Sequence, residues 1–197
     1  MKMKQRLSKA AAAAAAATIT GIAAFGFAPV AQLDTPAHAA TSQETSSQSQ
    51  TAVKNINEIY NAAVKGEVPR LTADFKIGKT LRQDVRDQFG PPPEGSSNNF
   101  DYYHAEMGHP GYAFGYDQNN VINEIRYFGT NVERQTNLGS ITQANLKKEL
   151  GQPNFTGKVK GDGTTQTKYT YHAGAYDLEF IFDDSKTLNH VNLVKKP

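Results

Sequence analysis

The chain has 197 residues, no Cys, and 21 Lys and Arg residues against 19 Asp and Glu residues. Without Cys, the protein has no disulfide, no thiol nucleophile and no thiolate metal site. The slight positive charge gives no support to nucleic-acid binding, because four of the bases lie within the first nine residues.

The first 39 residues have the pattern of a secretory signal peptide. A basic N-terminus precedes an Ala-rich apolar stretch, and the small-x-small sequence Ala37-His38-Ala39 follows it. Cleavage after Ala39 leaves 17 bases and 18 acids in residues 40–197. We therefore expect a secreted protein, extracellular or cell-wall associated, with no membrane segment after cleavage. The alternative is that the segment is retained as a membrane anchor.

The next two segments differ in apolar content. Residues 40–51 are rich in Ser, Thr and Gln and contain no large apolar side chain. Such a segment cannot repay the entropy cost of ordering, so we predict a disordered spacer. Val53, Ile56 and Tyr60 then recur at steps of three and four, which predicts a helix that ends at Gly66.

An internal repeat is the most informative feature of the sequence. Residues 77–92 and 138–153 align without a gap at an offset of 61. The identical positions are Gly78 and Gly139, Gly90 and Gly151, and Pro92 and Pro153.

Each copy of the repeat predicts a short helix. In the first copy, Thr80 with Gln83 matches a capping box, and in the second copy Thr142 is the expected N-cap. Val85 and Phe89 form an apolar i,i+4 pair on one helix face, as do their counterparts in the second copy. A glycine with positive φ, followed by a proline, is expected to end each helix.

Both copies continue into similar strand patterns. Residues 103–105 and 171–173 both read Tyr-His-Ala, within runs that alternate aromatic and β-branched side chains with polar ones. Each unit is therefore expected to be one helix followed by a three- or four-stranded antiparallel meander. We predict an α+β fold of two such units in tandem, residues 52–129 and 130–197. The helices are expected on one side, and the two sheets can join into one continuous curved sheet.

The repeat motif resembles a known fold family. The run from Gly78 through Val85 and Phe89 to Pro92, ahead of a meander, looks like the β-lactamase-inhibitor-protein-like fold, which outer-membrane assembly lipoproteins of the SmpA/OmlA type share. With its leader, first helix and two units, the chain is similar to the YjgB-like family of uncharacterised secreted Gram-positive proteins. The likeness covers about residues 52–197 and implies a fold, not a function. Unlike the inhibitor proteins, this chain has no Cys and no Trp, and no contact residues carry over.

Candidate catalytic and metal sites have simpler structural interpretations. His104, Glu106 and His109 fall in a loop rather than on a helix, so we expect them to be solvated. His172 and His190 share a sheet face but lie four strand positions apart, too far for one metal at about 3.4 Å per residue. The Gly-x-Ser-x-Gly motif is also absent. We therefore predict no catalytic residue, no metal site and no cofactor.

Strand alternation also predicts an open sheet face that is not covered by helices. Its mixture of aromatic, His and charged side chains suits reversible contact with a partner. The predicted partner-binding residues are Tyr102, His104, Glu124, Arg126, His172, Glu179 and His190.

Two functional classes follow from this face. The leading prediction is a secreted, non-enzymatic binding or inhibitory module, expected to be a monomer, that binds an extracellular or cell-wall protein and no nucleic acid. The alternative is a cell-wall or envelope hydrolase, or a subunit of one. A hydrolase is expected to show a deep pocket with convergent ionisable groups, whereas a binding module is expected to show a broad and shallow face.

Overall fold

The computed structural model describes residues 38–93, 97, 99–132, 134, 137–161 and 163–196, with side chains from Ser49 onward. The predicted signal peptide lies outside these residues except for its last two positions. The described helices are α1 (His38–Val64), α2 (Arg82–Phe89) and α3 (Gln143–Leu150), with a 3-10 turn, η2 (Leu138–Ser140), before α3. The described strands are β1 (Phe100–Tyr103), β2 (Gly111–Tyr116), β3 (Ile122–Gly129), β4 (Phe155–Lys160), β5 (Thr165–Ala173), β6 (Tyr176–Phe182) and β7 (Leu188–Lys195).

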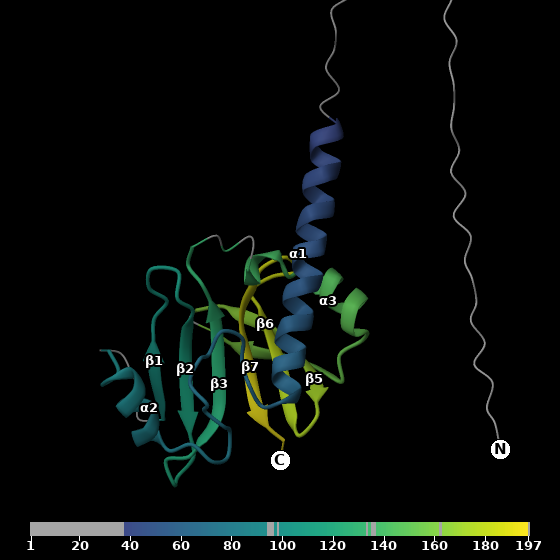
Figure 1. Cartoon of the computed structure of the whole chain (residues 1–197). Coiled ribbons are helices and arrows are strands. Elements are labelled where there is room, and N and C mark those ends of the chain that lie inside the picture. The colour runs from purple at the N-terminus through teal and green to yellow at the C-terminus, as the bar shows by residue number, and fades with distance from the viewer. Residues whose placement is uncertain are drawn as a thin grey trace, which may run out of the picture. The chain divides into compact units, whose positions relative to one another are not determined.

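All seven described strands form one antiparallel sheet in the order β1-β2-β3-β7-β6-β5-β4. The two predicted meanders join where β3 pairs with β7, and Arg126 there lies opposite Asn192. Figure 1 shows the sheet twisting from β1–β3 toward β5 and β6, with α1 lying across the second half. The predicted α+β class, with antiparallel strands in one continuous sheet, is therefore confirmed.

The two-residue turn at Gly174-Ala175 predicts the register of the β5–β6 hairpin, and the structure agrees. The Gly174-Ala175 turn closes the β5–β6 hairpin and places His172 opposite Asp177. In the next hairpin, Ile181 lies opposite His190. A two-residue turn determines the pairing of every residue in its hairpin, so local turn chemistry was enough to predict it.

The hydrophobic core lies between the sheet and the helices. Ile56 of α1, Val85 of α2 and Leu146 of α3 are each 0% exposed and belong to one core cluster. The sheet supplies alternate residues to this core, as predicted: Phe114, Tyr116, Ile125, Tyr127, Tyr169, Tyr171, Leu178, Phe180, Phe182, Val191 and Leu193. Because the described helices pack on this face, the polar residues of the strands gather on the opposite, open face.

Helix α1 is longer than the sequence pattern predicts. The prediction of a disordered spacer over residues 40–51 is wrong, because α1 begins at His38 and includes all of them. Propagating a helix adds one hydrogen bond for each residue fixed, whereas starting one is costly. The part of α1 that packs on the sheet supplies the start, and no Gly or Pro interrupts the chain between His38 and Gly66. Although α1 has 27 residues, neither it nor another described helix has the apolar length that crossing a membrane requires.

The caps of α2 and α3 follow the repeat with one difference. Thr142 caps α3 as predicted, with the Asn145 N–H donating to its hydroxyl at 3.2 Å. The predicted Thr80 cap is wrong: α2 begins one residue later, and the Leu81 N–H donates to the Asp84 carboxylate at 2.9 Å. The Thr80 hydroxyl instead accepts from the Lys76 N–H at 2.8 Å.

The ends of the two helices also agree with the repeat. Gly90 and Gly151 have φ values of 81° and 80°, a region that favours glycine. Phe89 is 37% exposed at the rim of the core, although its ring lies 5.1 Å from that of Tyr103. Leu150 is partly buried against the same core. Of the i,i+4 pair in the first copy, Val85 is therefore buried in the core and Phe89 is only partly buried.

A buried ion cluster fastens α2 to β1. Asp101 of β1 is 0% exposed and accepts hydrogen bonds from Arg82 Nη2 at 2.6 Å and Arg86 Nε at 2.9 Å. The Tyr116 hydroxyl also donates to this carboxylate at 3.3 Å. Since neighbouring residues of a strand point to opposite faces, anchoring Asp101 on the helix side positions Tyr102 on the open side.

Candidate functional site

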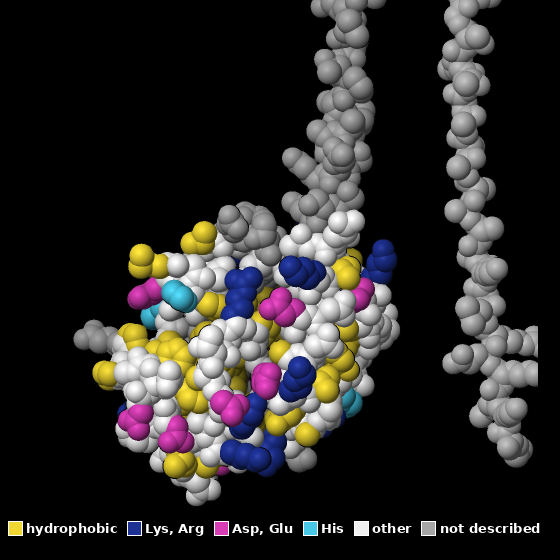
Figure 2. Space-filling view, viewed as in Figure 1, with side chains coloured by type: hydrophobic (Ala, Val, Ile, Leu, Met, Phe, Trp, Pro, Cys, Tyr) yellow, Lys and Arg dark blue, Asp and Glu magenta, His cyan; other side chains and the backbone are white. Residues whose placement is uncertain are grey.

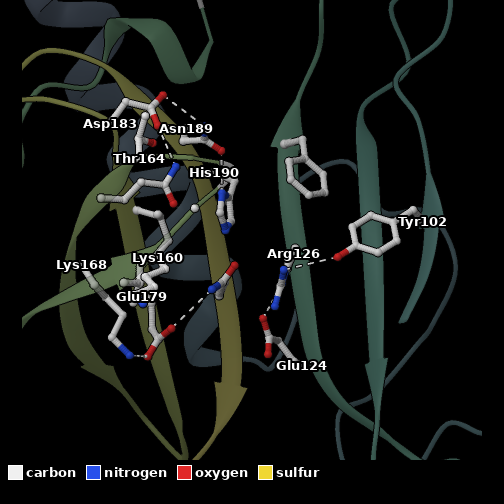
Figure 3. Close-up of a pocket in the computed structure, with 16 residues that line it drawn as sticks. Tyr102, Glu124, Arg126, Lys160, Thr164, Lys168, Glu179, Asp183, Asn189 and His190 are labelled. Atoms are coloured by element: carbon white, nitrogen blue, oxygen red, sulfur yellow. Dashed lines mark hydrogen bonds and ion pairs between the residues drawn. The ribbon is translucent and has the colours of Figure 1, made fainter. Parts of the chain in front are cut away.

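A cavity of about 610 Å³ is hollowed in the open face of the sheet. Figure 3 shows Tyr102, Glu124 and Arg126 on one side of it, and Lys160, Lys168, Glu179 and Asp183 on the other. The described residues that line it are Tyr102, Glu124, Arg126, Phe128, Val159, Lys160, Gly161, Thr164, Gln166, Lys168, Glu179, Ile181, Asp183, Asn189, His190 and Asn192. We call this cavity the sheet pocket.

The far wall of the sheet pocket comes from the β4–β5 hairpin. Val159 and Lys160 end β4, and Gly161 and Thr164 belong to the turn that leads into β5. The Gly161 N–H donates to the Thr164 carbonyl at 2.9 Å, which closes this turn. β4 is one of the two edge strands of the sheet and pairs with β5 as far as Lys160, so the β4–β5 hairpin borders the pocket.

Two ion pairs line opposite sides of the pocket. Arg126 Nε donates to Glu124 Oε1 at 2.6 Å, and Lys168 Nζ lies 2.5 Å from Glu179 Oε1. Glu124 and Arg126 are two residues apart on β3, so they share a face. Lys168 and Glu179 are diagonal neighbours across β5 and β6, within reach of long side chains. The ionisable side chains are thus held in position before any ligand arrives.

The guanidinium group of Arg126 also packs on an aromatic ring. Its guanidinium carbon lies 4.2 Å from the centroid of the Phe100 ring, a favourable cation–π position. Gly115 lies opposite Phe100 in the β1–β2 pair. A Cβ on Gly115 would come within 2.7 Å of that ring, so glycine at this position makes room for the stack.

A chain of hydrogen bonds orients His190. Asn189 Nδ2 donates to both carboxylate oxygens of Asp183 at 3.0 and 3.1 Å, so its amide oxygen faces His190 Nδ1 at 2.7 Å. His190 Nδ1 therefore carries the hydrogen, and its Nε2 is left as an acceptor. Figure 3 shows the His190 ring pointing into the pocket between the two groups of side chains.

Burial lowers the pKa of His190 to about 4, and the positive charge of Arg126 adds to this effect. The Asp183 carboxylate acts in the opposite direction but does not offset it. The imidazole is therefore neutral at neutral pH, which preserves its acceptor nitrogen.

Asn192 has an unsatisfied acceptor in the lining of the pocket. Its side chain is 7% exposed, and its Nδ2 donates to Glu179 Oε2 at 3.3 Å. Its Oδ1 is buried and has no hydrogen-bond partner among the described residues. Leaving a buried acceptor unpaired costs roughly 1–3 kcal/mol, so a ligand donor that displaced the covering side chains and reached this atom would recover that free energy.

The pocket also has an aromatic wall. The Phe128 ring lies 5.3 Å from the His190 ring and 6.5 Å from the Tyr102 ring, measured between centroids. Ile181, at 2% exposure, adds apolar surface from β6. A ligand therefore meets a polar lining with one apolar side.

The structure brings together five of the seven predicted site residues. They are Tyr102, Glu124, Arg126, Glu179 and His190.

The other two predicted residues lie apart from the sheet pocket. His104 is exposed beyond β1 and lines a neighbouring cavity of about 490 Å³. His172, near the end of β5, lies 2.7 Å from Asp177 Oδ1 and packs edge-on against Phe155. His172 therefore contacts Asp177, but it does not line the sheet pocket.

Part of the expected open face is recessed rather than solvated. Strand alternation assigns Ile181 and Asn192 to this face correctly, yet they are only 2% and 7% exposed. Their neighbours on the concave face cover them, which alternation along one strand cannot reveal.

Sequence reasoning missed several pocket residues. Phe128 and Lys168 follow the alternation of Arg126 and His172, so the same pattern would have found them. No alternation pattern marks Lys160 and Thr164 as pocket residues, because their contribution depends on where the end of the β4–β5 hairpin lies relative to the other strands. Figure 2, in the same view as Figure 1, shows charged side chains of both signs lying among apolar ones on that face of the molecule.

The comparisons with known proteins agree with one another. Residues 56–194 match the family described as a domain of unknown function, DUF4309. The uncharacterized protein YjgB of Bacillus subtilis (strain 168) is 41% identical over 199 residues, covering 98% of this chain and all of that protein.

A solved structure supports the same relationship. The crystal structure of the DUF4309 family protein YjgB from Bacillus subtilis is 43% identical and superposes with a TM-score of 0.66, covering 75% of this chain and 99% of that one. The chain therefore belongs to the DUF4309 family of domains of unknown function.

Proposed function

We propose that this protein is an exported, non-enzymatic binding module whose ligand site is the sheet pocket. The observation that carries the proposal is Asn192 Oδ1, a buried acceptor without a partner among the described residues, in the lining of a cavity of about 610 Å³. Ligand pockets usually have volumes of about 300–1,000 Å³ and a few well-placed polar groups. The N-terminal leader supports export, and the helix-free sheet face is consistent with the resemblance to the β-lactamase-inhibitor-protein-like fold.

The arrangement of charge favours binding over hydrolysis. Hydrolysis of a glycosidic bond uses one carboxyl group as an acid and another as a base or nucleophile. The pocket glutamates, Glu124 and Glu179, are instead each held by a cation, Arg126 and Lys168. Paired and immobilised charges give orientation and specificity to a bound molecule.

The concavity of the pocket favours a small molecule, or one unit of a polymer, over a flat protein surface. A protein partner of standard size buries about 800 Å² of each surface and would have to fill the recess with a projecting side chain or loop. An extracellular or cell-wall protein that contacts this face by such a projection is the other outcome of the test.

The test is an NMR titration of the purified protein with small neutral, cationic and anionic compounds, followed by the backbone amides. We expect at least one class to shift the amides of Arg126, His190 and Asn192. Replacing Arg126→Ala should weaken that response, because Glu124 then loses its cation. His172→Ala, on the same face but outside the pocket, is the matched control and should respond as the wild type does.

Three results would contradict the proposal. The first is that none of the compounds perturbs the pocket amides. The second is that Arg126→Ala and His172→Ala respond alike. The third is conversion of the bound compound to product, which would show that the module is an enzyme.

A further inference from the structure

We propose that the sheet pocket binds an uncharged saccharide, with a sugar hydroxyl donating a hydrogen bond to Asn192 Oδ1. This inference rests on the proposed function and names the chemical class of its ligand. Four features of the pocket support it: an unpaired acceptor, a second acceptor, a balanced charge and an aromatic wall.

The unpaired acceptor indicates that the ligand must supply a hydrogen-bond donor. Asn192 Oδ1 is buried and unpartnered among the described residues, while the Nδ2 of the same amide is already committed to Glu179. A ligand therefore gains most if it donates an O–H or N–H at this point. An anion without hydrogens, such as a fully ionised carboxylate, has nothing to donate there.

The second acceptor extends the same requirement. The Asp183–Asn189–His190 chain leaves His190 Nε2 as an acceptor, and its ring points into the pocket (Figure 3). Arg126 and Lys168 supply donors nearby. A polyhydroxylated molecule can both donate to the two acceptors and accept from the cations, since each hydroxyl has one donor and two acceptor sites.

The charge of the pocket argues against an ionic ligand. Its lining carries three cationic side chains, Arg126, Lys160 and Lys168, and three carboxylates, Glu124, Glu179 and Asp183. Two of the cations already contact two of the carboxylates. A phosphate or an ammonium group would therefore meet no excess of opposite charge, and it would lose its hydration on entering.

The aromatic wall favours a ring with an apolar face. Tyr102 and Phe128 contribute neighbouring rings on the β1–β3 side of the pocket. A pyranose carries hydroxyls around its edge and C–H groups on its faces, so it can pack a face on such rings while its edge reaches Asn192. Small linear polyols and single amino acids lack this combination.

The experiment compares ligands that share one ring. The amides of the purified protein are followed by NMR during titration with glucose, N-acetylglucosamine and its β-1,4-linked dimer and tetramer. Glucose 6-phosphate and glucosamine add a negative or a positive charge to the same ring. At about 10 mM, the titration detects dissociation constants in the millimolar range. We expect the uncharged sugars to shift Asn192, His190 and Phe128, with the charged analogues binding at least about threefold more weakly.

The key variant is Asn192→Leu, which keeps the approximate side-chain size and removes the acceptor together with the long Nδ2 hydrogen bond to Glu179 at 3.3 Å. Saccharide affinity should fall by about tenfold or more, whereas the midpoint of urea unfolding should stay the same or rise, because a buried unpaired acceptor is removed. If Asn192 were only structural, the variant would lose stability instead. Asn123→Leu, an exposed asparagine of β3 outside the pocket, is the matched control and should bind as the wild type does.

The outcomes separate the two proposals. Failure of every uncharged sugar, or equal binding to Asn192→Leu, overturns the saccharide assignment. If charged or non-sugar compounds still shift the pocket amides in an Arg126-dependent way, the binding function stands and only the ligand class is wrong. If nothing shifts the pocket amides, both proposals fail together.

Discussion

Replacing Asp101→Asn tests the physical account of how α2 and β1 are held together. Burial alone would raise the pKa of Asp101, but hydrogen bonds from Arg86 and Arg82 overcome that effect and lower the pKa from 3.8 to about 2. At about 1.36 kcal/mol per pKa unit, this corresponds to about 2.4 kcal/mol of stability. The carboxylate is 0% exposed, but the two arginine side chains reach solvent, which screens part of the interaction.

The neutral amide of the variant removes the negative charge that both guanidinium groups contact. Breaking one partner out of a buried ion pair costs about 3–5 kcal/mol. The side chains of Arg82 and Arg86 are 19% and 36% exposed, so they can turn partly toward water. We therefore expect a loss of about 3 kcal/mol at pH 7, near the lower end of that range.

The assay is urea unfolding of both proteins between pH 7 and pH 2. A carboxylate whose pKa is lowered by folding stabilises the protein above its unfolded pKa, and this contribution is lost as the pH falls from about 4 to about 2. The wild type should lose that stability in this window, and Asp101→Asn should not. Asp87→Asn, an exposed position on the same helix, should change stability by no more than about 0.5 kcal/mol. A loss below about 1 kcal/mol for Asp101→Asn, or the same acid dependence in both proteins, would refute the reasoning.

Three further predictions follow from burial and backbone geometry. The pKa of His190 lies at about 4, below its usual value of about 6.5, so the stability that the neutral imidazole contributes is present above pH 6.5 and is lost as the pH falls toward 4. His190→Gln should therefore flatten the pH dependence of the free energy of urea unfolding between pH 6.5 and pH 4. An unchanged slope would contradict the assignment. Phe180→Ala, at a position that is 0% exposed, should cost about 3–5 kcal/mol, whereas Phe155→Ala, at 63% exposure, should cost about 0.5 kcal/mol or less by the same measurement. Gly66→Ala should lower the melting temperature measured by circular dichroism, because φ is +77° there and a Cβ would clash with the Tyr176 ring; an unchanged melting temperature would show that the turn adapts.

Local patterns were sufficient for much of the sheet. The two-residue turn at Gly174 determines that His172 faces Asp177, because hairpin pairing is counted outward from the turn. Alternation placed Phe180 in the core and Arg126 on the opposite face for the same local reason. The glycine and proline after each short helix marked its end, since few residues tolerate positive φ.

Other features depended on contacts that local patterns do not contain. Residues 40–51 have no large apolar side chain, yet they are helical because α1 extends through them from its packed part. Thr80 carries a capping signal, but its hydroxyl is taken by the Lys76 N–H of the preceding turn. Extension from a packed helix decided the first case, and a competing hydrogen-bond donor decided the second.

The sequence alone therefore determined the α+β class, the registers of the β5–β6 and β6–β7 hairpins and which residues point to the open face, because each depends on neighbours along the chain or across one hairpin. Only the tertiary structure decided that this face contains a pocket. The pairing of β3 with β7 brings Arg126 opposite Asn192, which is 66 positions later in the chain. Asn192 is only 7% exposed there, and its Oδ1 has no hydrogen-bond partner among the described residues. These features depend on packing between strands that are far apart in the sequence, and such contacts produce no repeating pattern of residues from which they could be predicted.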